Sequence, residues 1–358
     1  MRRHVPLVPL LAALLAACAH DPAAPVGVRP FAECAAITPY VPTGGWKSNC
    51  PGAVGMDSAR LRVAIDEASQ MSTLEALVVA RRGYVVVEGY WHGVRAATPI
   101  DLRSVTKAVT ASVVATEIRA GRIPSMEEPL TTYWSWLATS DDPRRATLRV
   151  RHLLDLSAGF DMNGSGQSSA DAPSWYLTRP LRWDPGTHWQ YDEGLYDVLS
   201  ALVRDVDPRG MRDAARADLF EPLGFAAASS RWPVNGVGNA YGAAGLRLTA
   251  REMLSIGELY RRDGVWDGQQ LLPAGWVAPM RVRPTGLTDE QEVWFRGWRQ
   301  IVLGGHLALY SIGYGGQYIV VVPDLEMVVA AGAIANAPQG SWPAVLSLVR
   351  DHVIPSAS

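Results

Sequence analysis

The first clear pattern along the chain is helical. Leu61 and Ile65 recur on one helical face after an N-cap candidate, Asp57 or Ser58. Polar residues occupy the positions between them, as on a helix that buries one side only. The pattern therefore predicts a helix over residues 57–71.

Strand patterns occur near both ends of the chain. β-branched and aromatic residues dominate two runs around Arg81-Arg82-Gly83, which predicts a hairpin. From Val293 onward further runs of this kind follow one another, and an amphipathic helix over 344–353 closes the pattern. The expected strands are residues 77–80, 84–90, 294–303, 306–310, 317–322 and 326–331.

Helical signals dominate the part between these strands. Residues 123–225 are mainly helix and loop in pattern, with Thr147 as the expected cap of a helix that includes His152. Thr249-Ala250-Arg251-Glu252 has the capping-box pattern and predicts a helix to about Arg262. Two more helices are expected, over residues 104–120 and 195–203. Gly121 follows the first of them as a typical C′ glycine.

This order of elements favours one fold class. Strands at both ends with helices between them predict an α/β (α+β) fold, in which both ends of the chain complete one antiparallel sheet. The helical lobe would be inserted at about 123–225, and a cleft would separate it from the sheet. The chain shows no βαβ repetition and no G-x-S-x-G motif, which disfavours doubly wound, barrel and α/β-hydrolase folds.

The N-terminus has the features of an export signal. Basic residues precede an apolar run that is too short to span a bilayer, and small residues lie just before Cys18. This resembles a bacterial lipoprotein signal over 1–17, with lipidation of Cys18 and a proline-rich tether over 18–30. The folded domain would then be 31–358, in a periplasm-facing lipoprotein of the cell envelope that contacts the membrane through its lipid. An ordinary signal peptide with an incidental cysteine is the alternative.

The other two cysteines and the net charge of the chain bear on which binding partners are expected. Cys34 and Cys50 can form a disulfide in an oxidising compartment, or they can be two free thiols. With no cluster of Cys and His, a structural metal is not expected. A formal net charge of −2 without a basic run argues against a nucleic-acid partner.

The use of lysine points to a chemical site. The chain has 31 arginines and only two lysines, and one of them, Lys107, follows Ser104 by three residues. Lysine can act as a base, whereas arginine remains protonated. On a helix the two side chains share a face, and the hydroxyl lies at the positive end of the helix dipole. The pair therefore predicts a Ser-Lys nucleophile, against the alternative of a helix cap beside a surface lysine.

Two later segments can complete such a site. Tyr191 follows a turn just before a helix and is the best candidate for a proton shuttle, although it can also be a packed aromatic. The glycines of residues 311–317 let a strand backbone approach substrate and point an N–H group into the site. His152 is expected to be a core or interlobe histidine. The tryptophans between Trp175 and Trp189 line an acyl pocket or belong to the core.

These residues carry a family resemblance over most of the chain. The sequence resembles the serine β-lactamase and penicillin-binding-protein superfamily, class C-like branch, and is similar to 6-aminohexanoate-oligomer hydrolases and related esterases. The matching segments are Ser104-x-x-Lys107, residues 148–159, Tyr191, residues 243–252 and 264–268, and residues 313–324. The resemblance implies a β-lactamase/transpeptidase-like fold and an acyl-enzyme, with no metal or cofactor. It makes Ser104 the nucleophile, Lys107 its base, Tyr191 the proton relay, and the N–H groups of Ser104 and Tyr314 the oxyanion hole.

Two departures from the family pattern bear on the substrate. The second motif is Tyr191-Asp192-Glu193, where the family usually has Asn or Ser in the third position. The third motif is Ser311-Ile312-Gly313, without the family's cation for a substrate carboxylate. We therefore expect a neutral or cationic ester or amide as substrate, with Ser311, Gly313, Tyr314 and Glu193 on the oxyanion and substrate-binding side. The alternatives are a D-Ala peptide or β-lactam substrate, and a non-catalytic envelope binding protein in which Glu193 quenches Lys107.

Overall fold

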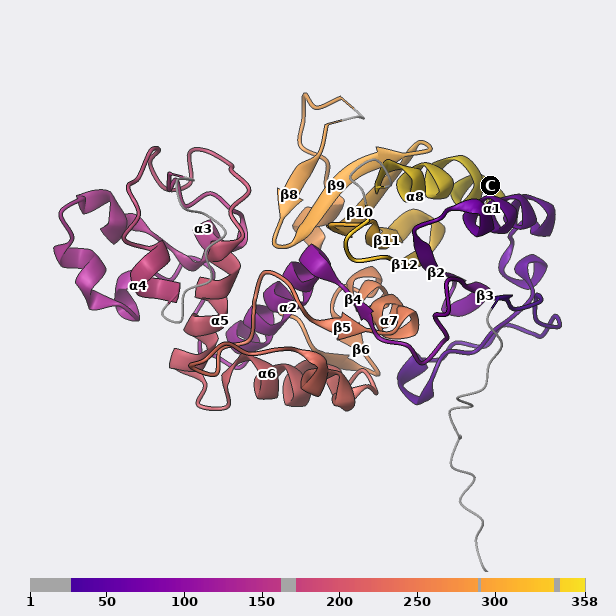
Figure 1. Ribbon diagram of the computed structural model, residues 1–358, viewed down its shortest axis with the longest axis horizontal. Coiled ribbons are helices and arrows are strands. Elements are labelled where there is room, and N and C mark those ends of the chain that lie inside the picture. Colours follow the sequence, from indigo (N-terminus) through magenta and orange to yellow (C-terminus); the bar gives the residue numbers. More distant parts are fainter. Residues whose placement is uncertain (1–26, 162–171, 289–290, 338–341, 358) are drawn as a thin grey trace, which may run out of the picture.

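The core of the molecule is a single antiparallel sheet. The computed structural model describes residues 27–161, 172–288, 291–337 and 342–357. The sheet has eight strands in the order β1-β3-β2-β12-β11-β10-β9-β8 (Figure 1). The strands are β1 (Gly27–Val28), β2 (Leu74–Arg81), β3 (Tyr84–Tyr90), β8 (Val293–Phe295), β9 (Trp298–Leu303), β10 (His306–Gly313), β11 (Gln317–Val322) and β12 (Met327–Ala333). Two small ladders pair β4 (Ile100–Asp101) with β5 (Arg247–Leu248), and β6 (Val265–Trp266) with β7 (Gln269–Gln270).

The two ends of the chain meet in the middle of this sheet. β2 pairs with β12 in antiparallel register, with Val79 opposite Val329. Because helices cover both faces, the central strands are apolar along most of their length rather than alternating. Val328 belongs to the apolar cluster on one face, together with Leu254, and Val329 to the cluster on the other face, together with Leu61. The predicted fold class and the pairing of both ends of the chain are confirmed.

Helices pack on each face of the sheet. The helix α7 (Ala250–Arg261) covers one face, and its Gly257 permits close approach, because a Cβ there would lie 2.5 Å from Val328 Cγ1. The helices α1 (Ser58–Gln70) and α8 (Trp342–Leu348) lie on the other face (Figure 1). Asp57 caps α1, and Thr249 forms the predicted capping box at the start of α7.

The helix α2 (Thr106–Arg119) lies between the sheet and the helical lobe (Figure 1). Every side chain from Thr106 to Glu117 is buried, which agrees with the apolar pattern seen in the sequence. The lobe contains α3 (Val150–Leu154), α4 (Ala172–Tyr176), α5 (Gly194–Val206) and α6 (Gly210–Ala215). The N-terminal end of α2 is therefore placed where lobe and sheet meet.

Two element predictions are wrong in detail. Residues 294–303 form two strands rather than one, because the chain turns at Arg296 and Gly297, whose φ angles are 49° and 85°. Gly297 lies against α2, where a Cβ would meet the backbone N of Ala108 at 2.6 Å. Thr147 is not a helix cap: its hydroxyl donates to the carbonyl of Arg144, and α3 begins at Val150.

The N-terminal segment is fastened to the sheet. Cys34 and Cys50 form a disulfide, with an S–S distance of 2.01 Å. Residues 27 and 28 pair with β3, so the last part of the predicted tether belongs to the edge of the sheet. The predicted signal over 1–17 and Cys18 lie outside the described residues. Within the ranges that are described, no helix is long and apolar enough to cross a membrane.

Candidate active site

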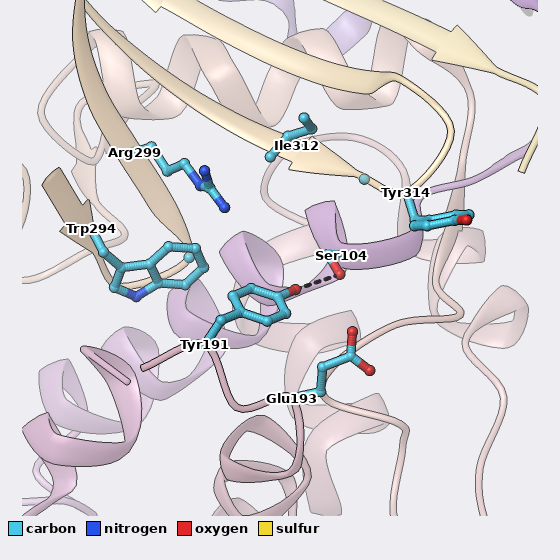
Figure 2. Close-up of a pocket in the computed structure, with 9 residues that line it drawn as sticks. Ser104, Tyr191, Glu193, Trp294, Arg299, Ile312 and Tyr314 are labelled. Carbon is cyan, nitrogen blue, oxygen red and sulfur yellow. Dashed lines mark hydrogen bonds between the residues drawn. The ribbon is translucent and has the colours of Figure 1, made fainter. Parts of the chain in front are cut away.

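A cavity of about 290 Å³ lies at the N-terminal end of α2, between the lobe and the strands β8 to β10. Figure 2 shows Ser104 in its centre, with Trp294 and Tyr314 on opposite sides. The lining residues come from four separate parts of the chain: Ser104, Tyr191, Glu193, Trp294, Gly297, Arg299, Ile312, Gly313 and Tyr314. The predicted nucleophile, proton shuttle and glycine-rich strand therefore meet in one place.

Ser104 lies in a 3-10 turn, Arg103–Val105, directly before α2. Arg103 has a φ of 48°, which is uncommon for a residue with a side chain. Two contacts hold it there: its N–H donates to Asp101 Oδ1 at 2.9 Å, and its Nε donates to the carbonyl of Ala335 at 3.0 Å. This turn presents the Ser104 hydroxyl to the cavity at the positive end of the α2 dipole.

Lys107 is fully buried one helical turn further on. Its Nζ donates hydrogen bonds of 2.9 Å each to Ser104 Oγ and to the carbonyl of Ala243. Nζ also lies 5.0 Å from the centroid of the Tyr191 ring. Across the described residues, no carboxylate, including that of Glu193, forms an ion pair with Lys107. The lysine is therefore held on the serine hydroxyl and not on an acid.

Hydrogen bonds also hold the backbone around Ala243, whose carbonyl binds Lys107. Asp197 on α5 accepts a hydrogen bond of 3.3 Å from the N–H of Ala243, and burial raises the pKa of Asp197 to about 6. The hydroxyl of Thr110 donates to the carbonyl of Gly242 at 2.7 Å. Only glycine fits at residue 242, because a Cβ would lie 1.9 Å from the Tyr196 carbonyl oxygen. No sequence pattern indicated these supporting contacts.

Tyr191 reaches the same hydroxyl from the lobe. Its OH lies 2.8 Å from Ser104 Oγ, and its ring meets Trp294 edge-on at a centroid distance of 5.9 Å. The next residue, Asp192, anchors the loop through a buried ion pair with Arg179. Asp192 Oδ1 also accepts a 3.2 Å hydrogen bond from the N–H of Gly194 at the start of α5. This loop places Tyr191 over Ser104 and leaves the Glu193 side chain exposed at the cavity (Figure 2).

The end of β10 forms the opposite wall. A Cβ at Gly313 would lie 2.4 Å from the carbonyl oxygen of Leu102, so the strand lies directly against the segment that precedes Ser104. Glycine is therefore required for this approach, and it brings the Tyr314 backbone to the edge of the cavity.

Ser311 does not reach the cavity, contrary to the prediction. Its hydroxyl donates to the carbonyl of Gly297 at 2.9 Å, and the side chain is buried. Alternation along β10 turns the neighbouring side chain, Ile312, to the cavity instead. Ser311 thus holds the β8–β9 turn rather than substrate.

Three lining residues were not expected from the sequence: Trp294, Gly297 and Arg299. Their only signal was their place in predicted strands, and a strand pattern does not say which face meets a cleft. The undecided tryptophan segment contributes Trp189, which lies 6.3 Å from Trp294 between ring centroids and lines an adjoining cavity.

Three histidines of the described residues, His152, His188 and His306, do not line the cavity. His152 is buried in the lobe, where its Nδ1 accepts a hydrogen bond from the N–H of Arg149. Burial lowers the pKa of His152 to about 4, which agrees with a neutral interior histidine. His188 stacks on Trp183 at 3.9 Å between ring centroids, and His306 pairs with Asp324 at 2.5 Å.

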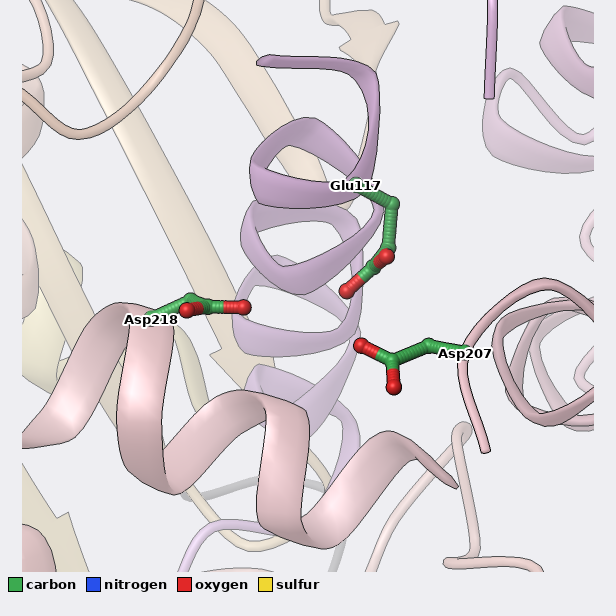
Figure 3. A group of neighbouring side chains, drawn as sticks. All are labelled: Glu117, Asp207 and Asp218. Carbon is green, nitrogen blue, oxygen red and sulfur yellow. The ribbon is translucent and has the colours of Figure 1, made fainter. Parts of the chain in front are cut away.

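One group of acids outside the cavity has the composition of a metal site. Glu117, Asp207 and Asp218 converge near the C-terminal end of α2 (Figure 3). Arg122, however, contacts all three carboxylates, with its Nη2 3.1 Å from Asp218 Oδ2. Arg209 adds a second guanidinium at Asp207 and Asp218. Two guanidinium groups therefore offset most of the negative charge of the three carboxylates, and the group joins α2 to the lobe.

Comparisons with known proteins agree with this geometry. Residues 67–347 match the family model described as Beta-lactamase. The 6-aminohexanoate-dimer hydrolase of Paenarthrobacter ureafaciens is 27% identical over 247 residues, which span 63% of this chain and 61% of that protein.

Solved structures show the same fold. A penicillin-binding protein homologue from Caulobacter crescentus aligns with a TM-score of 0.63 at 17% identity, covering 84% of this chain and 99% of that one. EstCE1, a hydrolase with promiscuous acyltransferase activity, aligns with a TM-score of 0.62 at 18% identity, covering 82% of this chain and 96% of that one. At these identities the structures establish the fold alone. The family match over most of the chain confirms the resemblance seen in the motifs, and the protein belongs to the β-lactamase family, class C-like, whose members are generally serine hydrolases.

Proposed function

We propose that this protein hydrolyses carboxylic esters or amides through an acyl-enzyme on Ser104. The observation that carries the proposal is the convergence of Lys107 Nζ and Tyr191 OH on Ser104 Oγ, at 2.9 and 2.8 Å. This is the arrangement that an activated nucleophile needs, with a base and a second proton carrier in direct contact.

The geometry supports a two-step reaction. Ser104 Oγ attacks the carbonyl carbon while its proton passes to Lys107, and a tetrahedral intermediate forms. The N–H groups of Ser104 and Tyr314 stabilise its oxyanion. Tyr191 delivers a proton to the leaving alcohol or amine as the bond to the carbonyl carbon breaks. Water then attacks the acyl carbon while Tyr191 takes back a proton from it. The bond to Ser104 Oγ breaks as Lys107 returns its proton to that oxygen, which releases the acid and restores the starting state.

The third motif favours esters and amides over β-lactams and D-Ala peptides. The cation that would bind their carboxylate is replaced by Ser311, whose hydroxyl is held by Gly297. The non-catalytic alternative requires Glu193 to hold Lys107 as an ion pair, and the described carboxylates make no such contact. The similarity to 6-aminohexanoate-dimer hydrolase also supports hydrolysis of an amide.

Labelling with a fluorophosphonate probe tests the proposal directly. We expect one adduct, mapped to Ser104 by mass spectrometry, and turnover of p-nitrophenyl butyrate. Ser104→Ala should abolish both, and Lys107→Ala should slow both by about 100-fold or more. Lys47→Ala is the matched control, because Lys47 is the other lysine of the chain and is exposed.

The possible outcomes separate the alternatives. A folded protein that takes no adduct would contradict the proposed function and favour a binding protein. Nitrocefin hydrolysis or stable penicillin labelling faster than ester turnover would favour the β-lactam or D-Ala peptide alternative.

We also propose that the protein is exported and anchored in the bacterial cell envelope by a lipid on Cys18. The support is the sequence pattern of residues 1–17 before that cysteine. Fractionation of cells that express the full chain tests this proposal. Cys18→Ser should move the protein from the membrane fraction to the soluble fraction or leave its signal uncleaved.

A further inference from the structure

The wall of the catalytic cavity carries two charged side chains, Glu193 and Arg299. Arg299 is already neutralised, because its Nη1 lies 2.5 Å from Glu292 Oε2. Glu193 has no such partner: among the described residues its carboxylate makes no ion pair. The cavity therefore has an uncompensated negative charge beside the nucleophile.

A carboxylate at a helix start is often explained as a cap, and here that explanation fails. Glu193 occupies the N-cap position of α5, yet its side chain makes no capping hydrogen bond. The neighbouring Asp192 takes that part, since its Oδ1 accepts from the N–H of Gly194. Asp192 is in turn held by Arg179. The loop is thus anchored without Glu193, whose carboxylate is left at the cavity (Figure 2).

Aromatic rings surround the same space. Tyr191, Trp294 and Tyr314 all line the cavity, and Tyr191 and Trp294 meet edge-on. The face of an aromatic ring attracts a cation, and a nearby carboxylate adds to that attraction where water is partly excluded. Lys107 and Arg299 already lie 5.0 and 5.9 Å from the ring centroids of Tyr191 and Trp294. The ring of Tyr314 is exposed, and a cavity with one free carboxylate and such a ring is suited to a small organic cation.

On this basis we infer that the substrate carries a cationic group, an ammonium or quaternary ammonium, close to its ester or amide bond, and that Glu193 binds it. The inference rests on the proposed function, since it names the substrate class of the same site. It also accounts for the departure from the family's second motif, because a carboxylate at residue 193 would repel the anionic substrates that the missing third-motif cation also disfavours.

Two thioester substrates of the same shape separate the effect of the substrate's positive charge from that of its size. Butyrylthiocholine and S-(3,3-dimethylbutyl) thiobutyrate have the same shape, and only the first is cationic. At low ionic strength we expect kcat/KM to be about tenfold higher for the cationic thioester, with the preference reduced by added salt. Glu193→Gln should bring the ratio of the two kcat/KM values to about one. Glu127→Gln is the matched control, because Glu127 is an exposed lobe carboxylate outside the cavity and its loss changes the net charge equally.

The outcomes distinguish this inference from the function beneath it. Equal kcat/KM values for the two thioesters would overturn the inference while leaving the hydrolase intact. A preference that persists in Glu193→Gln would overturn the assignment to Glu193. If neither thioester is turned over, the rates at which a choline phosphonothiolate and its uncharged isostere phosphonylate Ser104 give the same ratio. No reaction with either phosphonothiolate would instead overturn the proposed function.

Discussion

The hydroxyl of Tyr191 lies 2.8 Å from Oγ of Ser104, although 87 residues separate the two along the chain. Ser104 stands at the start of the buried helix α2, and Tyr191 stands on a loop of the helical lobe that Asp192 and Arg179 anchor. The site therefore exists only where lobe and sheet are docked. Changes that alter this docking should affect activity before they unfold the protein.

Tyr191→Phe should lower kcat/KM for p-nitrophenyl butyrate by about 100-fold, because the ring stays in place while the proton carrier is lost. Tyr314→Phe is the control, since it keeps the backbone N–H that the mechanism requires. Both variants are compared with wild type by steady-state kinetics and by melting temperature. A rate for Tyr191→Phe within threefold of wild type would remove Tyr191 from the mechanism.

Gly313→Ala should reduce activity more than stability. The added Cβ would lie 2.4 Å from the Leu102 carbonyl oxygen, so β10 must move away from the turn that holds Ser104. Overpacking of this kind costs about 1–3 kcal/mol of unfolding free energy. Gly236→Ala is the control, because no heavy atom lies within 4 Å of a Cβ there. Ester turnover and urea unfolding of both variants check the expectation, and full activity in Gly313→Ala would contradict it.

The buried carboxyl of Asp155 should make stability depend on pH. Burial raises the pKa of Asp155 to about 6, and its Oδ1 has no hydrogen-bond partner in the described structure. The unfolded chain ionises this group near pH 4. As pH rises from about 4 to about 6, the unfolded state therefore loses its proton first, and the folded state becomes less stable by about 3 kcal/mol.

Asp155→Asn removes this penalty, because the amide does not ionise. Its unfolding free energy relative to wild type should increase between pH 4 and pH 6 and stay level above pH 6. Comparing the two proteins at each pH cancels the contribution of His152 to the pH dependence of stability. The lowered pKa of His152 makes that contribution opposite in sign to that of Asp155. A difference that is constant from pH 4 to pH 7 would show that Asp155 titrates normally.

The disulfide should stabilise the N-terminal segment. Cys34 and Cys50 are 16 residues apart. Closing a loop of that size lowers the conformational entropy of the unfolded chain, which adds about 3 kcal/mol to the free energy of unfolding. We expect the double variant Cys34→Ser/Cys50→Ser to lose about this much unfolding free energy. A reductant should lower the melting temperature of the wild type and leave that of the double variant unchanged, and an equal response of both would argue against the bond in solution.

Much of the fold could be predicted from local pattern. The helix at 57–71, the hairpin around Arg82, and the capping box at Thr249 all rest on short-range signals, and all are confirmed. The strand expected over 294–303 was divided in the structure by the turn at Arg296 and Gly297. At that turn Gly297 packs closely against Ala108 of α2. This contact joins segments that are distant in the sequence, so a local pattern does not reveal it.

The residues of the candidate site can be recognised in the sequence: a serine and a lysine one helical turn apart, a tyrosine on a later loop, and a glycine-rich strand. How these residues meet depends on the tertiary structure. It buried Lys107 against the Ala243 carbonyl, turned Ser311 away from the cavity, and set Trp294, Arg299 and Glu193 around Ser104. Helix and strand periodicity follows from interactions between residues that are close in the sequence. A cavity wall depends instead on which faces of distant elements pack together.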